Sequence, residues 1–161
     1  MSATNPPAIA LFYSTDAEED LLKETAEQLR PLYLSADWFP LESSPDWKRL
    51  AQEVDDGNRR AVVAFGGSSQ SPAARLAAHI QLPVLALPPI TGRNSLVRVQ
   101  QAMKTSRDAA PVATFALGRA GARNAALFAA AIIANQDQVG AAALRKFREQ
   151  QTSQVLAATL D

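Results

Sequence analysis

Three short segments of the chain carry residue types from which a small-molecule site can be built. They are Ser14-Thr15-Asp16, Glu42-Ser43 and Gly66-Gly67-Ser68-Ser69. Hydroxyls and backbone amides can bind a phosphate, and a carboxylate can accept hydrogen bonds from sugar hydroxyls or move a proton. These segments therefore point to a polar small molecule as the ligand.

The stretch from Gly66 to Ser69 is the strongest of the three for binding an anion. Two glycines after an apolar run let backbone N–H groups approach a ligand, and a helix that begins there favours negative charge. No Gly-Lys-Ser/Thr follows, and the Gly-x-Gly-x-x-Gly spacing is missing, so neither common nucleotide-binding loop is present. The alternative interpretation is a tight turn closed by a serine that caps the next helix.

Asp16 and Glu42 are the acidic residues placed for binding or catalysis. Asp16 either accepts hydrogen bonds from a sugar or begins a helix, and Ser14 and Thr15 beside it can donate to a phosphate. Glu42 lies in a loop bounded by two prolines. It is a general acid or base if a crevice desolvates it, and otherwise it is a solvated loop acid.

The composition excludes several other chemistries. The 161 residues include no cysteine and one histidine, His79, which excludes disulfides, thiolate sites and multi-histidine metal sites. His79 is predicted near the end of a helix, away from the three segments, as a structural or solvent-exposed residue. Sixteen Lys and Arg balance sixteen Asp and Glu, so the basic excess of a nucleic-acid binder is missing. The longest apolar run, residues 125–134, is too short to cross a bilayer.

Apolar runs alternate with helical patterns along the chain, which is typical of βαβ units. Strands are predicted at 8–13, 32–39, 61–65, 83–87 and 112–117. Helices are predicted at 16–29, 46–54, from the 66–69 stretch to about 80, and at 94–104, 119–134 and 138–156. We expect a three-layer α/β/α sandwich of flavodoxin-like type, with a five-stranded parallel sheet and an extended C-terminal helix. The ligand crevice of such a sheet lies beyond the carboxyl ends of its strands, where the three segments fall.

The last predicted strand and the helix after it resemble a known family. Residues 111–127 read PVATFALGRAGARNAAL. This is similar to the P-V-x-T-L-A-I-G-x-A-G-A-x-N-A-A-L of the PurE family, the carboxyaminoimidazole ribonucleotide mutases. These enzymes are also known as the catalytic subunit of aminoimidazole ribonucleotide (AIR) carboxylase. Residues 82–88, LPVLALP, resemble the family's V-P-V-L-G-V-P, and the similarity spans about residues 8–157.

The resemblance implies a reaction and an assembly. The family moves a carboxylate to or from the C4 carbon of an imidazole ribonucleotide, with no metal or organic cofactor. Its bacterial members are typically homo-octamers of 422 symmetry, whose centre the alanine-rich helices of this chain would line. From the length, the balanced charge and the polar, proline-containing residues 1–7, we expect a single domain over residues 1–161, cytoplasmic, with no nucleic-acid or membrane partner. A core-packing role for the same alanines is the alternative.

The sequence departs from the family where its site residues stand. The family's first loop, G-S-x-S-D, is Phe12 to Asp16 here, so Asp16 matches the ribose-binding aspartate. The second loop, S-A-H-R-T-P, reads PLESSP at 40–45. Glu42 therefore stands where the family has its proton-transfer histidine, and Ser43 where it has its phosphate-binding arginine. In the third loop the double glycine is kept, and the family's second histidine becomes Gln70 or Ser71.

Three interpretations of function follow from these departures. The first is a divergent enzyme that uses Glu42 for proton transfer, with Lys48 or Arg107 replacing the missing arginine. The second is a non-catalytic paralogue that serves as an oligomeric scaffold or nucleotide-binding module. The third is a lyase or carboxylase for a different small molecule. A crevice filled by aromatic side chains of Phe12, Tyr13 and Phe65 would exclude the first.

Overall fold

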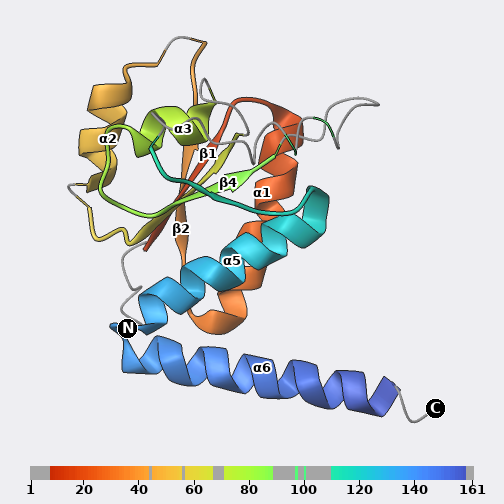
Figure 1. The fold of residues 1–161 in the computed structure, drawn as a ribbon. Helices are drawn as coiled ribbons and strands as arrows, with labels where there is room; N and C mark the ends of the chain where they lie inside the picture. Colours follow the sequence, from red (N-terminus) through yellow and green to blue (C-terminus); the bar gives the residue numbers. More distant parts are fainter. Residues whose placement is uncertain are drawn as a thin grey trace.

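The computed structural model describes residues 8–43, 45–55, 57–66, 71–88, 97, 100 and 110–158. Within these ranges, five parallel strands form one sheet in the order β2-β1-β3-β4-β5 (Figure 1). The strands are β1 (Ile9–Tyr13), β2 (Ala36–Pro40), β3 (Ala61–Phe65), β4 (Val84–Leu87) and β5 (Ala113–Thr114). The predicted five-stranded parallel sheet is confirmed.

Helices cover both faces of the sheet, which makes the predicted three layers. They are α1 (Asp16–Leu29), α2 (Trp47–Asp55), α3 (Pro72–Ala77), α5 (Gly118–Ala134) and α6 (Gln138–Ala158). Helices α1 and α5 share one apolar core with the sheet, and α2 and α3 share the other. Strands β1, β3 and β4 are buried almost throughout, because side chains on both of their faces are covered.

The alanines of α5 pack within the chain, against α1 and the sheet. The residues in this contact are fully buried: Ala122, Ala125, Ala126 and Ala129. Their small side chains bring the two helices close enough for the buried Thr25 hydroxyl of α1 to donate to the Ala122 carbonyl at 3.3 Å. Core packing therefore accounts for this face of α5.

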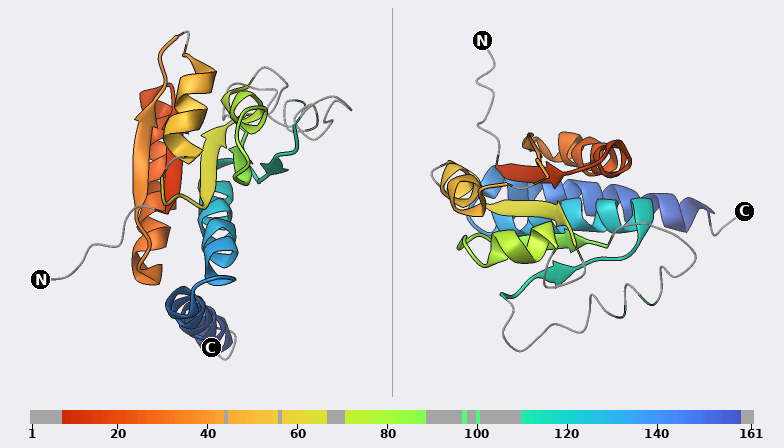
Figure 2. Two further views of the ribbon diagram at one scale, coloured as in Figure 1. Left: turned by 90° about the vertical axis from the view of Figure 1, so that its left-hand side faces the viewer. Right: turned by 90° about the horizontal axis from the view of Figure 1, so that it is seen from above.

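Helix α6 lies at one end of the sandwich rather than on a sheet face (Figure 2). It packs on α5 and on the 3₁₀ turn η1 (Arg30–Leu32), with Leu144 joining Leu32 and Ala130 in a third apolar cluster. Of its 21 residues, only Gly140 and Leu144 are buried. None of the helices that the structure describes is long and apolar enough to span a membrane.

The second predicted strand, 32–39, is wrong in its first half. Residues 30–32 form η1, and Tyr33 follows in a left-handed conformation with φ 59°. The Tyr33 N–H donates to the Arg30 carbonyl and the Leu34 N–H to the Leu29 carbonyl. The chain therefore turns here before it enters β2, and the apolar Leu32 and Leu34 pack in the cores without forming a strand.

Two other predicted elements are shorter than expected. Helix α3 ends at Ala77 rather than near 80, and β5 covers two residues of the predicted 112–117. Among the described strands, β5 pairs only with β4, through Ala113 and Thr114. The chain leaves the sheet after Thr114, because α5 begins at Gly118. The predicted helix at 94–104 falls almost wholly outside the described residues.

Candidate functional site

The sheet order brings the first two predicted segments together at its carboxyl edge. β1 lies between β2 and β3, so the loops that follow these three strands are neighbours. The Leu41 N–H donates to the Tyr13 carbonyl at 2.7 Å. Ser14 directly follows Tyr13 in the chain, and Glu42 directly follows Leu41, so this bond brings the starts of the two segments together. Gly66, at the end of β3, donates its N–H to the Leu87 carbonyl at 2.9 Å.

The first loop is held in place by the start of α1. Thr15 is the N-cap of the helix, and its hydroxyl accepts from the Glu18 N–H at 3.3 Å. The Glu18 carboxylate in turn accepts from the Ser14 N–H at 2.7 Å. Ser14, Thr15 and Asp16 are exposed, as a ligand-contacting loop requires.

Sequence reasoning missed Glu18, although a signal for it was present. Thr15-Asp16-Ala17-Glu18 has the T-x-x-E spacing of a capping box, in which the glutamate reaches back to a backbone N–H before the helix. Here Glu18 reaches back to Ser14, one residue earlier than in the usual pattern. This carboxylate therefore helps to hold the first loop in place, beside Asp16.

The second loop leads from the sheet edge into α2. Glu42 and Ser43 are both exposed, and Asp46 caps α2 by accepting from the Arg49 N–H at 3.1 Å. The bond between Leu41 and Tyr13 fixes the loop at its start. The structure thus places Glu42 at the carboxyl edge of the sheet, within one residue of the contact with the first loop.

The third loop is described only at its two ends. Gly66 is buried, and a side chain there would meet the Ser71 hydroxyl at 2.5 Å, so glycine is required for this close approach. Ser71 is the N-cap of α3 and accepts from the Ala74 N–H at 3.4 Å. The predicted Gly67, Ser68 and Ser69 lie outside the described residues.

The aromatic side chains next to these loops belong mainly to the cores. Phe12 is fully buried and stacks on Phe39 with ring centroids 4.7 Å apart, and Phe65 is buried on the other face. Tyr13 is half-buried and meets Trp38 edge to face at 6.1 Å. These rings therefore pack sideways against the strands and helices. Phe12 and Phe65 therefore belong to the two apolar cores.

The remaining sequence candidates lie apart from the loops. His79 is exposed just after α3, at the end of that helix farther from the crevice, as predicted. Lys48 is exposed on α2, and Arg107 lies outside the described residues. Across the part of the chain that the structure describes, no three His, Asp or Glu side chains are grouped as metal ligands.

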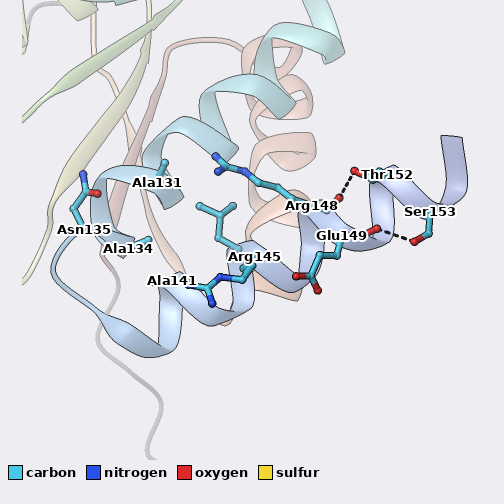
Figure 3. A pocket seen from close by; sticks show the side chains of 10 residues that line it. Ala131, Ala134, Asn135, Ala141, Arg145, Arg148, Glu149, Thr152 and Ser153 are labelled. Atoms are coloured by element: carbon cyan, nitrogen blue, oxygen red, sulfur yellow. Dashed lines mark hydrogen bonds between the residues drawn. The ribbon is translucent and has the colours of Figure 1, made fainter. Parts of the chain in front are cut away.

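A cavity of about 650 Å³ opens at the opposite end of the molecule. It is lined by α5 and α6, with Arg145, Arg148 and Asn135 among its polar residues (Figure 3). The C-terminal end of α5 forms one wall, whereas the crevice loops lie near the N-terminal end of that helix. This cavity is therefore separate from the crevice that the sheet topology defines.

Comparison with known proteins decides the family. The AIR carboxylase family model matches residues 40–154, more than two thirds of the chain. The chain belongs to the AIR carboxylase family. The matched region begins at Pro40, so it includes the loop of Glu42 and Ser43 and the whole of α5.

The relatives of the chain are mutases of the same family. The N5-carboxyaminoimidazole ribonucleotide mutase of Brucella melitensis is 30% identical over 155 residues, which cover 91% of this chain and 93% of that protein. The mutase of the same name from Escherichia coli K12 is 28% identical over 162 residues, covering 96% and 94%.

Solved structures of the family show the same fold. Treponema denticola PurE superposes with a TM-score of 0.75, covering 94% of this chain and 95% of that one, at 14% identity. A PurE2 protein from the same organism gives a TM-score of 0.79, covering 96% of both chains, also at 14% identity. The flavodoxin-like architecture predicted from the sequence is therefore the family's own.

Proposed function

We propose that this chain is a divergent carboxylating or decarboxylating enzyme that acts on aminoimidazole ribonucleotide or a related imidazole compound. The observation that carries the proposal is the 2.7 Å bond between Leu41 N–H and the Tyr13 carbonyl. It sets Glu42, at the position of the family's proton-transfer histidine, beside the Ser14–Asp16 loop. The relatives named N5-carboxyaminoimidazole ribonucleotide mutase supply the reaction class.

Glu42 is proposed as the group that moves the proton at the imidazole C4 carbon. When CO2 adds to C4, a C–C bond forms and the C4 proton leaves to the Glu42 carboxylate. In the reverse direction the protonated Glu42 returns that proton as CO2 departs. Glu42 is exposed in the free chain, so a bound ring would have to exclude water from it for this acid–base role to be effective.

The other loop residues are proposed as ligand contacts. Asp16 would accept hydrogen bonds from the ribose hydroxyls, and Ser14, Thr15 and Ser43 would donate to polar ligand atoms. Gly66 would let the ligand approach the backbone at the end of β3. Gly67, Ser68 and Ser69 complete this set from the sequence alone. The reaction as proposed requires no metal or organic cofactor.

We further propose that the chain works as a homo-octamer, in the cytoplasm, as one domain over residues 1–161. Helix α6 supports assembly because most of its surface is uncovered within one chain. Val139, Val155 and Leu156 are 69%, 65% and 59% exposed, and Tyr33 beside the start of α6 is 74% exposed. Exposed large apolar side chains on one helix indicate that this helix contacts another subunit, which would remove them from water.

The direct test is the decarboxylation of carboxyaminoimidazole ribonucleotide, followed by ultraviolet absorbance. Wild type is compared with Glu42→Gln, and Glu53→Gln on the exposed side of α2 is the charge-matched control. Turnover should fall by roughly 10²–10⁴ in Glu42→Gln, the usual contribution of a general acid–base group, and should persist in the control. Equal turnover in wild type and Glu42→Gln would remove Glu42 from the mechanism.

A second candidate function is the non-catalytic paralogue, either a scaffold or a nucleotide-binding module. It is favoured by Ser43, which replaces the phosphate-binding arginine of the family pattern. A lyase for a different small molecule is favoured by the same residue. Absence of turnover in the wild type at millimolar substrate would support these two candidates, and ligand binding without turnover would then favour the module.

A further inference from the structure

The cavity between α5 and α6 is a site that the proposed function does not use. Its volume of about 650 Å³ falls in the range of small-molecule pockets, roughly 300–1,000 Å³. Its apolar lining comes from four side chains, Ala131 and Ala134 of α5 and Ala141 and Leu144 of α6 (Figure 3). Because alanine side chains fill little of the space between the two helices, an organic group has room to lie on this lining.

The charge at this cavity is positive. Arg145 and Arg148 stand three residues apart on α6, which places them on one side of the helix in adjoining turns. Glu149 is the one acidic side chain among the lining residues that the structure describes. Asp137, just before α6, is already engaged, because its carboxylate accepts from two backbone N–H groups of that helix at 3.0 Å. A dianion therefore gains more from the two arginines than it loses to the glutamate.

The guanidinium groups of both arginines have free donors. Both side chains are exposed, and within the described part of the chain neither forms an ion pair or a side-chain hydrogen bond. Arg145 and Glu149 are four residues apart, but this order, with the cation first, is the weaker one along a helix. The Thr152 and Ser153 hydroxyls donate to carbonyls of the preceding turn at 3.0 Å, so they have no donor left for an anion. The two arginines and the Asn135 amide are therefore the donors with which this cavity can hold an anion.

We propose that this cavity binds an organic phosphate, with the phosphate group held by Arg145 and Arg148. A phosphate monoester presents three terminal oxygens, and a planar guanidinium can donate to two of them at once, so both arginines can bind one phosphate group. The organic part then lies on the apolar lining, out of water. Val155 and Leu156, which support the subunit contact proposed above, are not among the described lining residues, so binding and assembly use different residues of α6. The cavity shares no residue with the crevice loops, and the inference is therefore independent of the proposed function.

The test compares three probes that separate the two parts of such a ligand. Phenyl phosphate carries both an apolar ring and a phosphate, inorganic phosphate lacks the ring, and phenol lacks the phosphate. Isothermal titration calorimetry of the full chain at pH 7.5, where a phosphate monoester is mostly a dianion, should give phenyl phosphate a dissociation constant about tenfold lower than that of inorganic phosphate. Phenol should not bind at the same concentrations. Raising salt from 50 to 500 mM should weaken phenyl phosphate binding severalfold, because salt screens the attraction.

Three variants locate the binding. Arg148→Gln should raise the dissociation constant of phenyl phosphate about tenfold, because charge-assisted hydrogen bonds are lost. Lys146→Gln is the matched control. It removes one positive charge from the same helix, at a residue that lines the groove beside Tyr33, and should change that constant by less than about twofold. Ala141→Leu keeps both arginines and fills part of the apolar lining, so phenyl phosphate should then bind no more tightly than inorganic phosphate.

The outcomes decide between this site and its alternatives. Phenyl phosphate binding that is weakened by Arg148→Gln and kept in Lys146→Gln supports the inference. Equal weakening in these two variants would show a general effect of net charge and would overturn it. No binding of phenyl phosphate at millimolar concentration would also overturn it, and a smaller assembly of Arg148→Gln would then show that the arginine contacts another copy of the chain. Neither negative result bears on the proposed function, whose test is turnover at the crevice.

Discussion

At the scale of single residues, the candidate site keeps some residues of the family pattern and departs from it at others. Asp16 and Gly66 stand where the family pattern has an aspartate and a glycine, and the structure keeps both at the carboxyl edge of the sheet. Glu42 and Ser43 replace a histidine and an arginine in an exposed loop, where the fold imposes few constraints on residue type. Substitution at such exposed loop positions is expected to cost little stability.

Gly121 is the residue whose identity the fold constrains most sharply. A Cβ at this position would lie 1.7 Å from the Ala116 carbonyl oxygen, a backbone atom that cannot move aside cheaply. We expect Gly121→Ala to lower the free energy of unfolding by roughly 3 kcal/mol, the upper end of ordinary overpacking. Urea denaturation followed by circular dichroism measures the change.

The control for this variant is Gly140→Ala, also in a helix. There the added Cβ would meet the Asp137 carboxylate at 2.9 Å, and a side chain can rotate away. Its effect should stay within about 1 kcal/mol, because the helix gains roughly that amount when alanine replaces glycine. Similar losses in the two variants would contradict the role given to Gly121.

The residues of the site could be predicted from the sequence only where they follow a strand or match a motif. Ser14, Thr15 and Asp16 come directly after the buried run of β1, so their place at the sheet edge followed from periodicity. The burial of Phe12 followed from the same apolar run, whereas its stacking against Phe39 from β2 could not be predicted in this way. Phe12 and Phe39 are distant in sequence, so their contact can be identified only once the pairing of β1 with β2 is known.

At the scale of elements, the pairing of α1 with α5 holds the first loop against the sheet. Glu24 of α1 is 14% exposed and takes both Arg119 and Arg123 of α5 as partners. The first turns of α5 carry the residues most similar to the family pattern. The two ion pairs therefore tie that region to the helix that follows Ser14–Asp16.

Replacing Glu24 with glutamine should weaken this helix pair measurably. The side chain keeps its shape and loses its charge, so two largely exposed arginines lose a mostly buried partner. We expect about 1 kcal/mol of destabilisation, the upper end for ion pairs with largely exposed partners. Thermal unfolding at low salt measures it, with Glu27→Gln on the same helix as the control. Equal shifts for both variants would mean that the ion pairs contribute nothing specific.

The elements themselves were largely predictable, and the exceptions have local causes. Helix α1 begins and ends where the sequence indicates, because Thr15 caps it and Pro31 follows its last turn. The start of β2 was placed too early, because the apolar spacing of Leu32 and Leu34 is the same in a turn and in a strand. The left-handed Tyr33 that separates them leaves no signal in residue type, since such a conformation is ordinarily taken by glycine or asparagine.

At the scale of the whole molecule, the two ends of the sandwich are specialised differently. The carboxyl end of the sheet carries the acidic loops, and the other end carries α6, which extends past the body (Figure 2). Within one chain α6 is anchored mainly near its start, through Gly140 and Leu144, and its last turns are exposed. An element that gains so little from its own chain is expected to be stabilised by another copy.

The double variant Val155→Asp with Leu156→Asp tests that expectation. Both side chains are more than half exposed in the single chain, so their loss should leave the fold intact. Buried in a subunit contact, the two new carboxylates would be strongly unfavourable, and the assembly should dissociate to smaller species. Size-exclusion chromatography with light scattering measures the mass, and circular dichroism checks the fold.

The matched control adds the same two charges elsewhere. Gln52→Asp with Asn58→Asp places them on exposed positions in and just after α2. This control should keep the assembly of the wild type. An α6 variant that also keeps the wild-type mass would exclude these last turns from the subunit contact. A wild type that is itself monomeric would mean that the exposed apolar surface of α6 has another purpose. It would also mean that any ligand site at the carboxyl edge of the sheet is built from one chain alone.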